Sequence, residues 1–210
     1  IAAHVVGYTD IDSNGLAGIE KSRDTPLQEQ PEPITLSIDV RLQTILHDAL
    51  QDAITDFHAL GGTGLIMDVT SGEILSVVSL PDFDPQHAGD ASDDSKFNRA
   101  SLGVYEMGST FKIFNTALAL DSGVVHLTDS FDTVHPIEIG SHKIRDFERE
   151  TRCLNVAEIF THSSNIGSAH IAERIGTTRQ RAFLSALGLT QKASLEIPEV
   201  GAPLVPSSRD

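Results

Sequence analysis

The chemistry that this sequence could perform begins with a serine and a lysine three positions apart. Ser109 and Lys112 stand at the start of a hydrophobic run that continues to Gly123. Residues three apart on a helix share a face, and the N-terminus of a helix favours negative charge. A serine hydroxyl needs an adjacent base to attack a carbonyl, and a lysine can be that base only when its pKa falls from about 10.4 toward neutrality. We therefore expect a helix that opens at Gly108-Ser109 and carries a candidate nucleophile and base.

The ordinary alternative is a helix start followed by a solvated lysine. With 20 serines and 5 lysines in the chain, about half a chance match to Ser-x-x-Lys is expected. The apolar residues Ile113, Phe114 and Ala117 could form a wall that lowers the pKa of Lys112 by burial.

A second polar group, Ser163-Ser164-Asn165, lies between two predicted helices. Taken alone, these residues are typical of a helix cap. Taken with Ser109, they could relay a proton and hold an amide. The two patterns together match the S-x-x-K and S-x-N motifs of penicillin-binding proteins and class A β-lactamases.

The composition of the chain excludes several other classes of protein. The 210 residues carry a net charge of −15, with 40% hydrophobic and 21% charged residues, so we expect a globular protein that binds neither nucleic acid nor anionic lipid. The single cysteine, Cys153, cannot form a disulfide within the chain. None of the nine histidines has metal-ligand spacing, and we expect no metal or cofactor.

Hydrophobic periodicity predicts the elements that precede the candidate nucleophile. We expect a strand over 34–38, a long helix capped by Asp39 and ended by Gly61-Gly62, a hairpin of 64–69 and 74–80, and a loop over 81–101. Residues 1–24 suggest short strands and turns, and the proline-rich 25–33 suggests a linker.

The elements after the candidate nucleophile are predicted to be short. We expect strands and turns over 124–148, a helix capped by Asn155 and Glu158, a second helix over 169–174, and a third that is capped by Thr178 and ended by Gly188. The whole pattern indicates an α+β fold in which helices pack on an antiparallel sheet.

Four segments resemble class B penicillin-binding proteins, and they occur in the order of that family. Residues 98–112, NRASLGVYEMGSTFK, resemble the nucleophile segment, and 163–172, SSNIGSAHIA, resemble the second motif and its helix. Residues 64–85 resemble the hairpin and Asp-Pro loop before the nucleophile, and 4–24 the end of the N-terminal pedestal region. The resemblance implies a penicillin-binding-protein/β-lactamase-like transpeptidase fold, without its C-terminal part.

The resemblance also implies a role for each candidate residue. Ser109 would attack the carbonyl between two terminal D-alanines of a stem peptide, and Lys112 would take its proton. Ser163 and Asn165 would shuttle the proton and hold the substrate amide, and Ser164 and Glu106 would be further substrate contacts. The N–H of Ser109 would form half of an oxyanion hole. Glu106 could instead brace the helix start, which we consider the better interpretation.

The closest likeness is to the cell-division type, a septal peptidoglycan D,D-transpeptidase. The alternatives are the elongation type, a serine β-lactamase, and a non-catalytic β-lactam sensor or divisome-binding module. The resemblance implies peptidoglycan stem peptides, β-lactam antibiotics and cell-division proteins as partners, at the periplasmic face of the inner membrane, with an anchor outside this chain. It places the end of a pedestal or dimerisation region and a linker at 1–33, and the N-terminal portion of the transpeptidase domain at 34–210. The family's third motif, Lys-Ser/Thr-Gly, does not occur in the 210 residues, so we expect this fragment alone to be incomplete.

Overall fold

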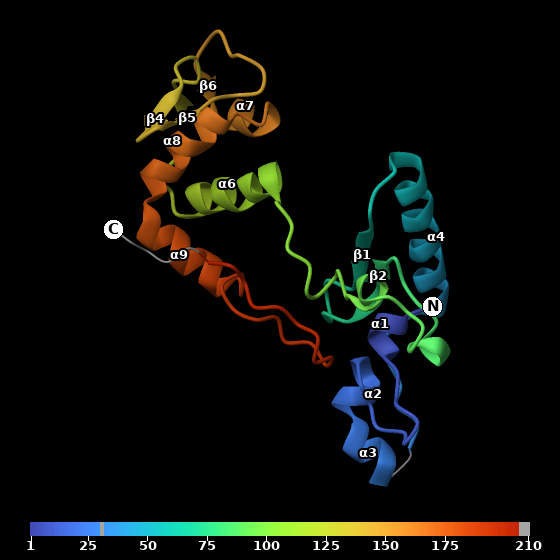
Figure 1. Ribbon diagram of the computed structural model, residues 1–210. Coiled ribbons are helices and arrows are strands. Elements are labelled where there is room, and N and C mark those ends of the chain that lie inside the picture. Colours follow the sequence, from blue (N-terminus) through green and yellow to red (C-terminus); the bar gives the residue numbers. More distant parts are fainter. Residues whose placement is uncertain (30–31, 206–210) are drawn as a thin grey trace. The chain divides into compact units, whose positions relative to one another are not determined.

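The computed structural model describes residues 1–29 and 32–205. The chain forms two compact units, which are described separately (Figure 1). The first unit contains Ile1–Val104 and Lys192–Pro203, and the second contains Tyr105–Gln191 together with Leu204 and Val205.

The longest element of the first unit is helix α4, Val40–Phe57. The side chain of Asp39 accepts hydrogen bonds from the N–H groups of Arg41 and Leu42, as expected of an N-cap. The prediction of its end at Gly61-Gly62 was wrong by three residues. His58 adopts a left-handed conformation with φ of 52°, and its N–H caps the carbonyls of the last turn.

The predicted hairpin is confirmed and lies against α4 (Figure 1). Strands β1, Gly62–Met67, and β2, Ile74–Leu80, pair antiparallel with an irregularity between Ile66 and Met67. A buried glutamine joins the helix to the sheet: Gln43 Oε1 accepts from Ser76 Oγ and Val77 N, both at 2.9 Å, and Gln43 Nε2 donates to Val77 O at 2.7 Å. The buried amide of Gln43 thus has hydrogen-bond partners for both its oxygen and its nitrogen where α4 packs on β2.

The prediction of a strand over 34–38 was wrong. This segment is irregular, and it meets the end of the hairpin through Ser37 Oγ, which donates to Ile74 O, and Asp39 N, which donates to Leu75 O. These two hydrogen bonds hold the segment beside the start of β2, but a β-strand requires a repeated series of backbone hydrogen bonds to a neighbouring strand.

Residues 1–24 also depart from the prediction of small strands. They form helices α1, Ala3–Val6, and α2, Gly18–Ser22, joined by a turn with a single bridge between Thr9 and Gly15. Part of the predicted linker is helical as well, in α3, Asp24–Glu29, while residues 30 and 31 lie outside the described residues. Short apolar patches contain too few residues for their periodicity to distinguish a helix from a strand.

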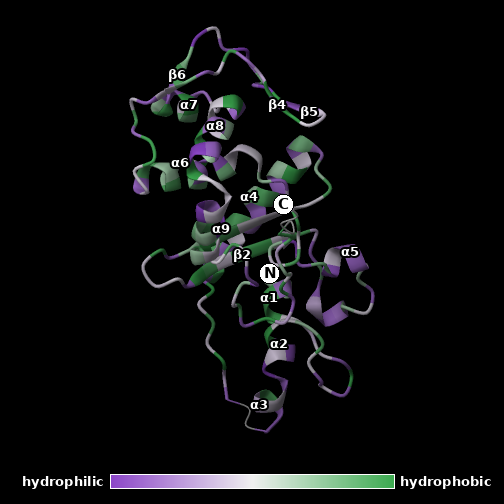
Figure 2. Cartoon of the chain, turned by 90° about the vertical axis from the view of Figure 1, so that its left-hand side faces the viewer, coloured by the Kyte–Doolittle hydropathy of each residue, from purple (hydrophilic) through white to green (hydrophobic). Residues whose placement is uncertain are grey.

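The segment 81–101 is mostly loop, as predicted, with two short helical turns. These are η1, Pro85–His87, and α5, Asp93–Lys96. The α5 turn is hydrophilic (Figure 2), and Ser92 caps it through Ser95 N.

The second unit is built from helices and two short antiparallel strand pairs around a small core. Its helices are η2, Gly108–Thr110; α6, Phe111–Asp121; α7, Val156–Thr161; α8, Asn165–Ile175; and α9, Thr177–Ala186. Strands β3, Ser130–Phe131, and β6, Leu154–Asn155, form one pair; β4, Ile137–Ile139, and β5, His142–Ile144, form another. The core contains Leu118, Ala119, Val125, Phe131, Leu154, Val156, Ile159, Ile171 and Ile175.

Local signals set the limits of α7, α8 and α9. The predicted capping box of Asn155 and Glu158 is confirmed at α7. Helix α8 is longer than the predicted 169–174, because Ser164 caps it and it begins at Asn165. Helix α9 begins at Thr177, one residue before the predicted cap at Thr178, after Gly176 with φ of 79°. Among the described residues, no helix is long and apolar enough to cross a membrane.

Candidate active site

Ser109 lies in a tight turn that leads directly into α6. Gly108 precedes it with φ of 54°, a left-handed conformation that glycine adopts at little cost. Gly108–Thr110 form the 3₁₀ turn η2, so Ser109 stands one turn before the α-helix proper. Its side chain is exposed, which leaves the hydroxyl open to a substrate.

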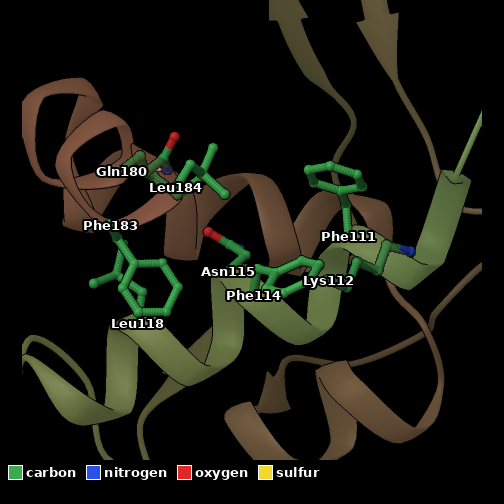
Figure 3. Close-up of a pocket in the computed structure, with 9 residues that line it drawn as sticks. Phe111, Lys112, Phe114, Asn115, Leu118, Gln180, Phe183 and Leu184 are labelled. Atoms are coloured by element: carbon green, nitrogen blue, oxygen red, sulfur yellow. Dashed lines mark hydrogen bonds between the residues drawn. The ribbon is translucent and has the colours of Figure 1, made fainter. Parts of the chain in front are cut away.

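Lys112 lies in the first turn of α6, beside an apolar cavity. The cavity has a volume of about 220 Å³ and is lined by residues of α6, α8 and α9: Phe111, Lys112, Phe114, Asn115, Leu118, Ala172, Gln180, Phe183 and Leu184. Figure 3 shows the Lys112 amine pointing away from the end of the cavity where Leu118 and Phe183 lie. The lysine stem therefore borders the apolar wall while its nitrogen reaches the polar site.

The predicted apolar wall is confirmed only for Phe114. Phe111 joins it, and the two rings meet edge to face with centroids 5.5 Å apart. Ile113 and Ala117 are exposed on another side of α6. Phe111, Phe114 and Leu118 recur at steps of three and four and so share the face of α6 that lines the cavity, whereas Ile113 and Ala117 fall between these steps.

Ser163 occupies the tight junction between α7 and α8. Its φ is 56°, which is unusual for a residue other than glycine. Its N–H donates to Phe160 O at 3.2 Å, and its carbonyl accepts from Lys112 Nζ. The left-handed turn thereby presents both the carbonyl and the hydroxyl of Ser163 to the lysine.

Four of the predicted residues form one hydrogen-bonded cluster. Ser163 Oγ lies 3.0 Å from Ser109 Oγ and 3.0 Å from Lys112 Nζ, so it links the two. Lys112 Nζ also donates to Asn165 Oδ1 at 2.7 Å. An ammonium has three donors, and the contacts to Ser163 O, Ser163 Oγ and Asn165 Oδ1 use all of them.

Burial against the aromatic wall lowers the pKa of Lys112 below its ordinary value. The negative charge of Asp146 acts in the opposite direction and raises this pKa, but it is the smaller effect. A lysine whose pKa is lowered by desolvation is a better base near neutral pH.

Ser164 has a different position from its neighbours. It is only 2% exposed, and its hydroxyl accepts from Gly167 N at 2.9 Å and donates to Asp146 Oδ2 at 2.8 Å. Both contacts hold the start of α8, so the structure gives Ser164 the role of a helix cap. The interpretation of Ser164 as a substrate contact stays a prediction, and in this structure its hydroxyl is buried and already paired.

Asp146 is the residue of this site that the sequence analysis missed. Its carboxylate accepts from Asn165 N at 2.5 Å, Ile166 N at 3.0 Å and Ser164 Oγ. It comes from the turn-rich segment after β5, about 20 positions before α8. An aspartate in such a segment has no spacing signal that connects it to the distant helix.

Glu106 and His162 lie near the cluster without joining it. Glu106 is exposed in the segment before η2, and within the described chain it has no hydrogen bond or ion pair. His162 pairs with Glu150, with 2.8 Å between Nδ1 and Oε1.

Ser109 precedes helix α6, Lys112 follows Ser109 by three residues, and the Ser163 hydroxyl lies between them. This arrangement has the pattern of the S-x-x-K class of serine acyl-transfer sites. Residues 62–208 match the family of the penicillin binding protein transpeptidase domain. The chain belongs to this family.

Curated relatives agree with this assignment. The chain is 44% identical over 213 residues to the probable peptidoglycan D,D-transpeptidase FtsI of Caulobacter vibrioides, covering 100% of this chain and 36% of the relative. It is 28% identical over 234 residues to the peptidoglycan D,D-transpeptidase FtsI of Escherichia coli, covering 100% and 40%. The chain therefore spans well under half the length of these relatives.

Solved structures confirm the predicted fold. Penicillin binding protein 3 of Mycobacterium tuberculosis, in its apo form, matches with a TM-score of 0.88 and 26% identity, over 98% of this chain and 49% of that one. The same protein complexed with aztreonam matches equally well. The chain thus has the transpeptidase fold over about half the length of its structural relative.

Proposed function

We propose that this chain carries the nucleophile-bearing part of a serine-type peptidoglycan D,D-transpeptidase of the cell-division type. The observation that carries the proposal is the continuous contact from Ser109 Oγ through Ser163 Oγ to Lys112 Nζ. The names of the FtsI relatives support the substrate and the division type, and the aztreonam complex of the structural relative supports acylation by β-lactams.

The acylation step begins when Lys112 is neutral. Its free electron pair then accepts the proton of the Ser163 hydroxyl, and Ser163 Oγ accepts the proton of Ser109. Ser109 Oγ bonds to the carbonyl carbon between the two D-alanines, and the resulting oxyanion binds the Ser109 N–H. The C–N bond then breaks, and the proton returns through the same contacts to the departing amine of D-alanine.

The transfer step reverses this proton path. The amine of a second stem peptide attacks the acyl carbon and forms a new amide bond, while Ser109 leaves and regains a proton. Asn165 holds Lys112 through Oδ1 during both steps, and its side chain, at an exposed position, also holds the substrate amide. A β-lactam imitates D-Ala-D-Ala, and its opened ring stays attached to Ser109.

The remaining assignments follow from the same proposal. Residues 1–33 correspond to the end of the pedestal region with its linker, and 34–210 to the N-terminal portion of the transpeptidase domain. The Lys-Ser/Thr-Gly motif does not occur in the 210 residues, so the proposal does not assign the full activity to this chain alone. The natural partners are stem peptides and cell-division proteins, at the periplasmic face of the inner membrane.

Labelling with a fluorescent penicillin tests the proposal on the full-length protein. We expect covalent labelling of the wild type and none of Ser109→Ala, because the nucleophile is lost. Ser122→Ala is the matched control, since Ser122 lies at the end of the same helix and its hydroxyl donates to Leu118 O. Labelling that persists in Ser109→Ala would disprove the assignment of the nucleophile.

The alternatives give different results in the same assay. Fast turnover of nitrocefin in place of a stable adduct would indicate a β-lactamase. Labelling without any cross-linking of stem peptides would indicate a β-lactam sensor or a divisome-binding module.

A further inference from the structure

We propose that Asp146 is the positioning residue of this site: it fixes the start of α8 against Lys112 and places a negative charge beside the lysine. This inference rests on the proposed function, since it assigns Asp146 a part in the acylation of Ser109. Three contacts of its carboxylate and the position of Asn165 carry it.

The first step is the completeness of the cap on α8. The first N–H groups of a helix have no partner within the helix. Asp146 accepts from those of Asn165 and Ile166, at 2.5 and 3.0 Å, while Ser164 Oγ accepts from Gly167 N at 2.9 Å. The Ser164 hydroxyl in turn donates to Asp146. One carboxylate thus holds both the helix and the residue that caps it.

The second step is the double attachment of Asn165. Its backbone N–H donates to Asp146, and its side-chain Nδ2 donates to Arg145 O at 2.9 Å. This leaves Oδ1 directed at Lys112 Nζ, at 2.7 Å. The segment 145–146 therefore determines where the Asn165 carbonyl oxygen stands, and with it one of the three acceptors of the lysine.

The third step concerns Ser163, which precedes the residues held by Asp146. Its left-handed backbone is a strained conformation for serine. Such a conformation persists when its surroundings fix it, and here Asp146 anchors the next three residues. The hydroxyl that joins Ser109 to Lys112 depends on this anchor.

The charge of Asp146 affects the pH dependence of acylation, which a purely structural role would leave unchanged. It raises the pKa of Lys112 against the effect of burial. Titratable neighbours at this junction are Arg145, next to Asp146, and the ion pair of His162 and Glu150 before Ser163. If neutral Lys112 is the base, the acylation rate falls at low pH as Lys112 becomes protonated, and this falling part of the pH profile, the acid limb, follows the pKa of Lys112. Loss of the Asp146 charge lowers that pKa and so moves the acid limb to lower pH.

The test measures the rate of acylation by a fluorescent penicillin from pH 5 to pH 10, on the full-length wild type and Asp146→Asn. The amide keeps Oδ1 for the two N–H groups but removes the charge and the acceptor of Ser164. We expect the acid limb to move to lower pH and the plateau rate to fall up to about 100-fold. A wild-type rate and limb, or a uniform loss of rate with an unmoved limb, would overturn the inference.

The matched control is Glu158→Gln. Glu158 also caps a helix with a carboxylate, in the capping box of α7, but it pairs with Arg152 and not with the cluster. We expect this variant to keep the wild-type acid limb; the same shift in Glu158→Gln and Asp146→Asn would overturn the inference.

Because the Ser164 hydroxyl is buried, Asp146→Asn is checked for folding by thermal unfolding. If it does not fold, Asp146→Glu tests the same point, since it keeps the charge but moves the carboxylate by a methylene. We expect slower acylation with the wild-type limb, and a wild-type rate in Asp146→Glu would overturn the inference. Absence of wild-type labelling at Ser109 would instead refute the proposed function itself.

Discussion

At the scale of single residues, the site depends on a serine in an unfavourable conformation. Ser163 has φ of 56°, and within the described part of the chain its hydroxyl alone links Ser109 Oγ to Lys112 Nζ. The cost of a left-handed conformation is about 1–3 kcal/mol for a residue other than glycine. Glycine would fit this backbone better, but it would lack the hydroxyl that contacts Ser109 and Lys112.

Two substitutions of Ser163 test the role of its hydroxyl separately from the role of its backbone conformation. We expect Ser163→Ala and Ser163→Gly to slow acylation about 100-fold or more, because both lose the proton path. Ser163→Gly should raise the unfolding midpoint, since glycine accepts the left-handed φ, while Ser163→Ala should not. Acylation kinetics and thermal unfolding check both effects.

Ser168→Ala is the control for the loss of a nearby hydroxyl. Ser168 Oγ donates to Ser164 O at 2.6 Å, outside the cluster, so acylation should stay close to the wild-type rate. Rapid acylation of both Ser163 variants would show that the proton reaches Lys112 without Ser163.

At the scale of elements, the site requires α7 and α8 to approach closely. Gly167 allows this, because a Cβ at that position would lie 2.5 Å from Ile159 Cγ1 and 2.8 Å from its Cγ2. Ile159 is completely buried in the core of the second unit. A larger residue at 167 would have to displace α8, and Asn165 with it.

We therefore expect Gly167→Ala to destabilise the protein by about 1–3 kcal/mol through overpacking. Acylation of Ser109 should slow as well, since α8 carries Asn165. Denaturant unfolding measures the first effect and penicillin labelling the second.

The double variant Gly167→Ala/Ile159→Ala provides the control. The shorter side chain makes room for the new methyl group, so the two losses of stability should sum to more than the loss in the double variant. Simple additivity would mean that the contact with Ile159 is not what excludes a larger residue.

The elements that the sequence predicted well are those defined by neighbouring residues. Asp39 caps α4, and Asn155 and Glu158 form the capping box of α7, because each cap joins residues two or three apart. The strand over 34–38 and the small strands over 1–24 were wrong, since strands need partners that no local pattern supplies. The members of the cluster were identified from motifs, but their support by Asp146 depends on a contact across 19 positions.

At the scale of the whole molecule, the first unit is held together by segments that are distant in sequence. Glu199 accepts from Gly18 N at 3.2 Å through Oε2, and its carbonyl accepts from the Ser101 hydroxyl. Gly201 N donates back to Ser101 O at 2.8 Å. The N-terminal helices, the loop before the nucleophile segment and residues 192–203 thus contact one another through these hydrogen bonds.

His4 adds a pH-sensitive contact to this arrangement. Its Nε2–H donates to Ser95 O at 2.8 Å, and its ring meets that of Phe83 edge to face. Burial lowers the pKa of His4, against the smaller effects of the Ser95 hydrogen bond and the charges of Asp82 and Glu199, while Arg99 lowers it further. The unfolded state therefore binds the proton more readily than the folded state does.

Because the pKa of His4 is lower in the folded state than in the unfolded state, its contact weakens as the pH falls. The stability that neutral His4 contributes is present above pH 6.5, and it is lost as the pH falls from there through the lower pKa of the folded state. We expect amide hydrogen exchange of residues 1–24, corrected for the intrinsic effect of pH, to be faster at pH 5.5 than at pH 7.5. His4→Gln can still donate an amide N–H but does not titrate, so its corrected exchange should not change between the two pH values. An equal response in the wild type and His4→Gln would assign the pH dependence to another group, because only the titration of His4 differs between the two proteins.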